Sequence, residues 1–147
     1  MNQLIRKNVI FPISLHDAKI SSILIQPASP EGLIDGGLTL VFDEGFYRID
    51  NGVEKQISNA LIKFSGIDFD YSLVYYFKDN IRQKISFEQF AKDVELLTVS
   101  VLDETYGYNH SKYHCTMYKD NDWHDVQIEI YHFKEIVYEW EEKSEER

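Results

Sequence analysis

The chain has 147 residues, a hydrophobic content of 44% and a formal net charge of −10, with 15 Lys and Arg against 25 Asp and Glu. This length fits one domain with its own core, so we expect a single domain over residues 1–147 with a frayed charged tail at 141–147. The acidic balance argues against nucleic acids and anionic membranes as partners, because both repel a negatively charged surface.

The chain ends and the cysteine content bear on the compartment. Cys115 is the only cysteine, so no disulfide can form within the chain, which is typical of a reducing compartment. The apolar run at 9–11, after Arg6 and Lys7, is too short for a signal-peptide core. No stretch approaches the roughly 20 apolar residues of a membrane span. We therefore expect a cytoplasmic protein that does not enter the membrane.

The first half of the chain predicts several strands. Residues 18–26 are rich in isoleucine and predict a first strand, which ends at a loop with two prolines and a glycine at 27–32. Residues 38–43 alternate apolar and less apolar side chains, as a strand with one buried face does. The turn residues Glu44 and Gly45 then lead into a strand at 46–50, so this pair predicts a hairpin.

The middle of the chain predicts two further strands and the only helix. The strands are expected at 59–65 and 71–78, and the second of these is strongly aromatic. A helix is predicted at about 87–95, with Ser86 as its cap and Gln89 reaching back to complete a capping box. Its apolar side chains recur at i, i+3, i+4 and i+7, which predicts one buried stripe: Phe87, Phe90, Ala91 and Val94.

The last third alternates with a period of two. Strands are predicted at 96–102, 113–118, 124–133 and 134–140, with a polar loop at 103–112. Together these elements predict a mainly β fold, α+β by count: an antiparallel sandwich or open barrel of about eight to ten short strands with one short helix.

The histidines and the cysteine do not predict a metal or catalytic site. His110 and His114 lie in a segment that is not helical, and four residues of strand span roughly 13 Å. Zinc ligands must all lie about 2.0–2.1 Å from one centre, so we expect no metal ion and no cofactor. Cys115 lies in a predicted strand with His114 on the opposite face, which favours a buried, inert thiol.

Two groups of residues are candidates for binding. His16 and Asp17 are adjacent at a strand entry, where Asp17 either accepts backbone N–H groups or forms a functional surface with the histidine. Aromatic side chains also gather around the late loop and hairpin, and such residues either form binding hot spots or pack the sheet. These aromatic candidates are Tyr106, Tyr108, Tyr113, Tyr118 and Trp123.

The function that follows from these observations is a non-enzymatic module that binds a protein partner. The sequence has no glycine-rich phosphate loop and no Gly-x-Ser-x-Gly motif, which lowers the expectation of an enzyme without excluding one. One alternative is a small-ligand-binding β-barrel, or an enzyme, whose pocket would bring together residues such as His16, Asp17, His114 or His132. Another is a homodimer in which an exposed strand pairs with its copy.

A resemblance to a known group of proteins supports the first function. Residues 15–20, Leu-His-Asp-Ala-Lys-Ile, followed by an aliphatic strand and by Leu-Thr-Leu-Val-Phe at 38–42, resemble a pattern in small bacterial β-rich proteins of the immunity type, which are linked with secreted toxins. This resemblance implies a β-rich domain that binds and neutralises a partner. It singles out His16 and Asp17 and implies no catalytic residue.

Overall fold

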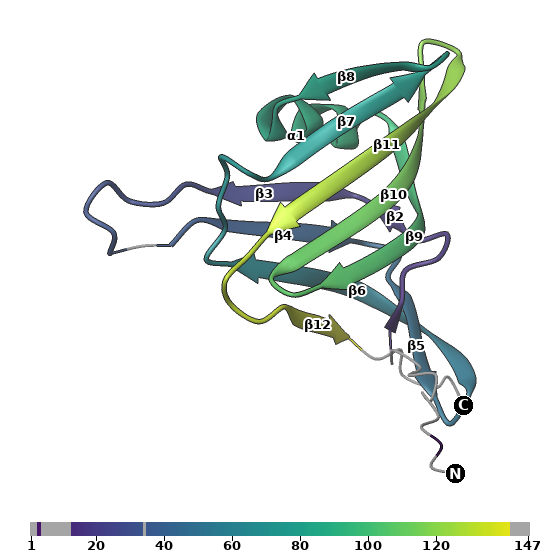
Figure 1. Cartoon of the computed structure of the whole chain (residues 1–147). Helices are drawn as coiled ribbons and strands as arrows, with labels where there is room; N and C mark the ends of the chain where they lie inside the picture. Colours follow the sequence, from purple (N-terminus) through teal and green to yellow (C-terminus); the bar gives the residue numbers. More distant parts are fainter. Residues whose placement is uncertain (1–2, 4–12, 34, 142–147) are drawn as a thin grey trace.

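The computed structural model describes Gln3, residues 13–33 and residues 35–141, and this part of the chain forms twelve strands and one helix (Figure 1). The strands form two antiparallel sheets packed as a sandwich that does not close into a barrel, which confirms the mainly β prediction. The runs at 6–7 and 9–11 lie outside the described residues, as do residues 142–147 of the tail predicted at 141–147. Glu141 is not frayed, because it belongs to the last strand and accepts from the Asn59 side chain. No helix in the described ranges combines the length and the apolar character needed to cross a membrane.

The first sheet centres on a long strand, β6. Its strands run in the order β1 (Ile13–Ser14), β5 (Phe46–Asp50), β6 (Val53–Ser65), β4 (Gly37–Phe42) and β3 (Ser22–Gln26), and β12 (Val137–Glu141) pairs with β6. β5 and β4 both pair with β6, along different parts of its length. Gly45 joins them with φ +78°, and a Cβ there would lie 1.5 Å from the carbonyl oxygen of Ile57. Only glycine allows this close approach of the two backbones.

The second sheet is built around two long hairpin strands. Its order is β2 (Lys19–Ile20), β9 (Thr98–Gly107), β10 (His110–Lys119), β11 (Asp122–Tyr131), β7 (Leu73–Lys78) and β8 (Ile81–Ile85). Two-residue turns close the β10–β11 and β7–β8 hairpins, and all four turn residues have positive φ: Asp79, Asn80, Asp120 and Asn121. Asn and Asp tolerate this conformation, which matches the twist of the strands.

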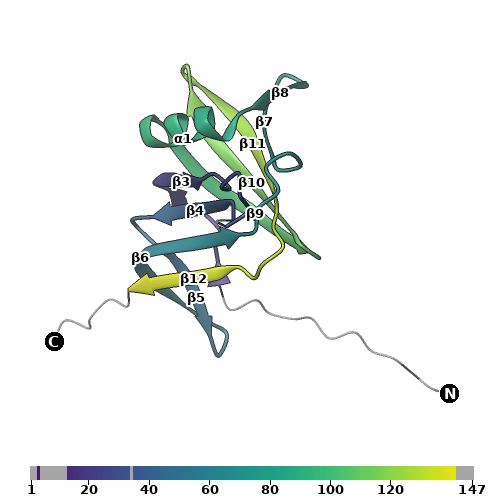
Figure 2. The same ribbon diagram turned by 90° about the vertical axis from the view of Figure 1, so that its left-hand side faces the viewer.

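The helix α1 (Phe87–Leu96) covers one end of the sandwich, beside β3 (Figure 2). Ser86 caps it by accepting the backbone N–H of Gln89 at 3.1 Å, as predicted. The predicted capping box is wrong in one detail, because the side chain of Gln89 donates forward to Asp93 Oδ1 at 3.1 Å. Asp93 is buried and also accepts from the Tyr76 hydroxyl at 2.7 Å, so the helix is tied to the second sheet.

The structure corrects several strand predictions, and the strand predicted at 59–65 begins earlier, at Val53. Residues 18–26 form two strands, because the chain crosses from the second sheet to the first at Ser21, whose N–H donates to the carbonyl of Val41. The predicted loop at 103–112 is wrong: β9 and β10 extend through it to a turn at 108–109, with polar side chains on the outer face. β8 was missed because its central residues are all polar. The short strand β1 was not predicted either, so the strand count is twelve rather than eight to ten.

Candidate functional site

The outer face of the second sheet carries five cross-strand side-chain pairs on β10 and β11, which we call the outer ladder. Its pairs are His110–Tyr131, Lys112–Glu129, His114–Gln127, Thr116–Asp125 and Tyr118–Trp123. The alternating residues of both strands point into the core, so period two places this whole set on one side. Directly opposed side chains on one face are the pairs that interact most strongly in an antiparallel sheet.

The two ends of the outer ladder are aromatic. Beside the β10–β11 turn, the rings of Tyr118 and Trp123 meet edge to face with centroids 5.1 Å apart. Trp123 is still 60% exposed and Tyr118 43%. At the other end, the rings of His110 and Tyr131 stack at 4.5 Å. These contacts hold the exposed rings in defined orientations without removing them from solvent.

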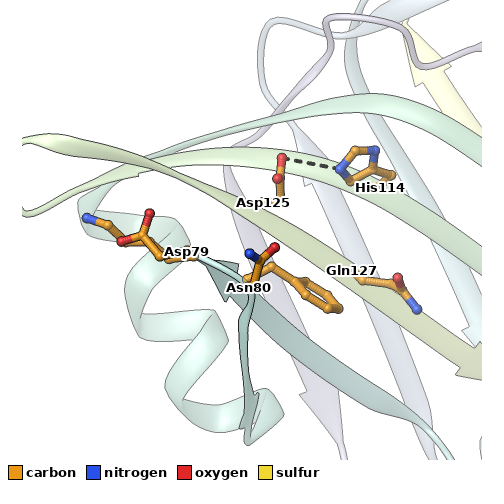
Figure 3. Close-up of a pocket in the computed structure, with 7 residues that line it drawn as sticks. Asp79, Asn80, His114, Asp125 and Gln127 are labelled. Carbon is orange, nitrogen blue, oxygen red and sulfur yellow. Dashed lines mark hydrogen bonds and ion pairs between the residues drawn. The ribbon is translucent and has the colours of Figure 1, made fainter.

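A shallow hollow of about 450 Å³ opens on the same face between the ladder and the β7–β8 turn (Figure 3). His114, Asp125 and Gln127 project from the sheet, and Asp79 and Asn80 lie across the hollow from them. His114 Nε2 lies 3.4 Å from Asp125 Oδ1, and both side chains are substantially exposed. The hollow therefore presents hydrogen-bonding groups to solvent beside an aromatic wall formed by Phe77.

The aromatic surface continues onto β7 and β8. Tyr75 lies opposite Gln127 of the ladder, and Phe77 lies opposite Asp125. The ring centroids of Tyr75 and Phe77 are 6.1 Å apart. The guanidinium of Arg82 lies over the Tyr75 ring at 4.6 Å from its centroid. Cation–π contact of this kind orients the arginine at the surface.

His16 and Asp17 lie at the opposite edge of this sheet, against β9. His16 Nδ1 is 3.1 Å from the carbonyl oxygen of Leu102, and its Nε2 is 3.4 Å from Asp17 Oδ2. The pKa of His16 is raised, mainly by the hydrogen bond to the Leu102 carbonyl and to a smaller extent by the charge of the Asp17 carboxylate. At the strand entry Asp17 uses its own backbone N–H, which donates to the carbonyl of Val101 at 2.8 Å.

A hydroxyl and carboxyl cluster lies just inside this edge, which we call the Glu104 cluster. Glu104 accepts the Leu15 N–H at 2.9 Å and the Tyr106 hydroxyl at 2.9 Å. The Tyr106 oxygen is also 3.4 Å from that of Tyr113 and accepts from the Tyr138 hydroxyl at 3.3 Å. Burial raises the pKa of Glu104, although its two hydrogen bonds oppose that shift. Burial likewise raises the pKa values of the three tyrosines.

A hollow of about 390 Å³ gives the Glu104 cluster access to solvent. Its lining includes His16, Asp103, Glu104 and Tyr106, together with apolar side chains such as Ile13. The structure thus brings two sequence candidates, His16 and Tyr106, to one place. Glu104 was missed because it fell in the segment predicted as a loop; its alternation with Tyr106 was the available signal.

The other sequence candidates separate into different environments. Tyr113 is fully buried, Tyr108 is 95% exposed at the β9–β10 turn, and Tyr118 and Trp123 lie on the outer ladder. The aromatic candidates therefore do not form one surface. The contribution of Tyr75 and Arg82 was missed, although a strand at 71–78 places Tyr75 and Phe77 on one face, opposite Tyr76.

The remaining histidine and cysteine candidates have structural roles. His132 is buried. Its Nδ1 lies 2.9 Å from the carbonyl oxygen of Lys134, and its Nε2 lies 2.8 Å from the Ser111 hydroxyl oxygen. Because a carbonyl oxygen can only accept, the Nδ1–H of His132 donates to Lys134, and both ring nitrogens have a hydrogen-bond partner. Cys115 is fully buried as predicted, and burial raises its pKa. In the described ranges no three or more His, Cys, Asp or Glu residues are grouped so that they could hold a metal ion.

No family model, curated protein or solved structure matches this chain. The resemblance of residues 15–20 and 38–42 to immunity-type proteins therefore stays a prediction.

Proposed function

We propose that this protein is a non-enzymatic binding module that takes a protein partner on the outer face of its second sheet. The observation that carries the proposal is the exposed Tyr118–Trp123 pair, held edge to face at one end of the outer ladder. Tyr, Trp and Arg are the residues that most often dominate the binding energy of protein interfaces. The proposal places the protein in the cytoplasm.

The composition of the outer ladder supports a partner that is a protein. Aromatic pairs stand at its two ends, and the ion pair of Lys112 and Glu129, at 3.8 Å, and the His114–Asp125 contact lie between them. Charges of both signs suit a surface that must match a partner's charges and exclude wrong partners. Rings that are already oriented lose little side-chain entropy on binding.

The resemblance of the N-terminal third to immunity-type proteins suggests which partner to look for. Under this proposal the partner is a toxin protein, which the module neutralises by covering part of its surface.

The test is capture of the partner from an extract of the source organism by the immobilised protein, with identification by mass spectrometry. The Trp123→Ala variant should no longer capture the partner. Trp140→Ala is the matched control, because Trp140 is a partly exposed tryptophan on β12 of the first sheet. Equal capture by wild type and Trp123→Ala, or loss of capture in the control, would contradict the proposal. A captured toxin should also be inhibited by the wild-type protein in a growth assay.

A second candidate function is binding of a small ligand in the hollow beside the Glu104 cluster. The favouring observation is that His16, Glu104 and Tyr106 line one solvent-accessible hollow. NMR spectra of the labelled protein with mixtures of small polar and cationic compounds test it. Saturable shifts of the Leu15 and Glu104 amides would support this function, and no shift with any mixture would count against it.

A further inference from the structure

The strand β8 ends the second sheet and leaves one edge of its backbone unpaired among the described strands (Figure 1). The two-residue turn at Asp79 and Asn80 makes Lys78 and Ile81 a hydrogen-bonded pair. Hydrogen-bonded and non-hydrogen-bonded pairs alternate along an antiparallel ladder. The backbone N–H and C=O groups of Arg82 and Lys84 therefore point away from β7, toward the open edge.

The side chains at this edge are basic on one face. Arg82 and Lys84 lie opposite Phe77 and Tyr75, so both project from the outer face of the sheet. Neither side chain has an ion-pair partner among the described residues, and both are exposed, in a chain whose net charge is −10. An extended segment beside β8 would meet two positive charges spaced two residues apart.

The other face of β8 has room for the side chains of such a segment. Ile81, which is 70% exposed, and Gln83 border a hollow of about 290 Å³. Ile85 borders a second hollow of about 370 Å³, whose wall includes Ile25, Phe69 and Phe87. A strand added to a sheet edge gains affinity from main-chain hydrogen bonds and specificity from pockets that take alternate side chains.

A second copy of the chain does not fit this edge through β8 itself. Antiparallel self-pairing centred on Gln83 would place Arg82 of one copy opposite Lys84 of the other. Directly opposed like charges destabilise a strand pair. Lysine and arginine on an edge strand are a common means of preventing such self-association.

We infer that β8 is the docking edge for an extended acidic segment of the protein partner, which pairs with the backbones of Arg82 and Lys84. Carboxylates of this segment alternate with apolar side chains: the carboxylates lie beside Arg82 and Lys84 on the outer face, and the apolar side chains enter the hollows beside Ile81 and Ile85. This inference rests on the proposed function. It specifies that the part of the partner that binds at the β8 edge of the second sheet is acidic and extended.

The direct test uses a fluorescent synthetic peptide with a core of alternating glutamate and valine. Binding is measured by fluorescence anisotropy at low salt, with a lysine–valine peptide of the same length as the control. The full-length protein should bind the glutamate peptide at least tenfold more tightly than the lysine peptide, and the bound peptide should slow amide hydrogen exchange at Arg82 and Lys84. Equal binding of both peptides, or no slowing at these two amides, would overturn the inference.

Two variants test the edge: Lys84→Pro removes a backbone N–H together with one charge, and R82E/K84E changes the charges alone. Lys84→Pro removes an N–H that faces the open edge, which an edge strand tolerates, and it should abolish peptide binding without loss of the native circular dichroism spectrum. The double variant R82E/K84E should weaken binding of the glutamate peptide at least tenfold. Lys92→Glu, on the exposed side of α1, is the matched charge control and should leave binding unchanged. Unchanged binding by both β8 variants would overturn the inference.

The same variants distinguish failure of the inference from failure of the proposed function. If the natural partner is captured by wild type and Lys84→Pro but not by Trp123→Ala, the proposed function stands and the β8 inference is wrong. If capture does not depend on Trp123, the proposed function fails, while peptide binding still reports on β8. Light scattering that showed wild-type dimers dissociated by Lys84→Pro would also overturn the inference, because a second copy would then occupy the edge.

Discussion

The β10–β11 hairpin has two faces that differ in almost every property. Away from the β10–β11 turn, its inner face is fully buried and is formed by Ser111, Tyr113, Cys115, Met117, Val126, Ile128 and Ile130. Its outer face is the ladder of charged, polar and aromatic pairs. The same two strands therefore hold the sandwich together on one side and leave the other side free for recognition. The two faces can differ in this way because successive side chains of a strand point to opposite faces of the sheet.

The two faces should respond very differently to loss of a side chain. We expect Ile128→Ala to lower the free energy of unfolding by about 2–5 kcal/mol, because it leaves a cavity in a fully buried position. Gln127→Ala, one residue away on the outer face, should change it by less than about 0.5 kcal/mol. Urea denaturation of both variants measures this, and similar losses in the two would break the comparison.

The Glu104 cluster extends the comparison to polar groups in the interior. Tyr106→Phe removes the hydroxyl shared with Glu104, Tyr113 and Tyr138, so it should destabilise the fold by about 1–3 kcal/mol. Tyr108→Phe is the control, because its side chain is almost fully exposed at a turn. A Tyr106→Phe protein as stable as the Tyr108→Phe protein would mean that the cluster does not stabilise the sandwich.

The outer aromatic pair should matter for binding more than for folding. Trp123→Ala removes an edge-to-face contact with Tyr118, and we expect a loss of about 0.5–1.5 kcal/mol in the free energy of unfolding. Partner capture should be lost although the protein remains folded at the assay temperature, which thermal unfolding checks. A loss as large as that of Ile128→Ala would show instead that the outer face also maintains the fold.

The smallest expected effect concerns pH. The pKa of Glu104 is raised in the folded protein above its ordinary value of 4.5, so the folded state retains this proton to higher pH than the unfolded chain. Between the unfolded and the folded pKa the folded state binds more protons, and the contribution of this group to stability falls as pH rises through that window. Glu104→Gln should remove this component. The difference in unfolding free energy between wild type and the variant, followed upward from pH 4, measures it; a difference that does not change with pH would contradict it.

The sequence predicted the elements whose signals are local. The alternation at 38–43 and 126–130, the turn residues at 44–45, and the Ser86 cap each depend on a few neighbouring residues, and all appear in the structure. Strands without an apolar alternation were missed or shortened. β8 is the clearest case, since its polar residues lie at an edge where neither face needs to be apolar.

The candidate site was predictable only in part, for a similar reason. Tyr113 and Trp123 are equally good candidates for binding in the sequence, yet Tyr113 is fully buried and Trp123 is mostly exposed. The strand register decides this, because a shift by one residue exchanges the two faces. His16 and Leu102 are separated by 86 positions, and no local pattern predicts their contact.

The sequence alone therefore determined a mainly β, antiparallel body with one capped helix, because these features follow from the spacing of apolar and turn residues along the chain. It left a sandwich and an open barrel as alternatives. The tertiary structure decided which aromatic rings reach solvent, how the Glu104 cluster comes together, and which strand stands at the edge. Those outcomes depend on pairing between strands far apart in the chain, where many registers satisfy the local pattern and only the packing of the whole core selects one.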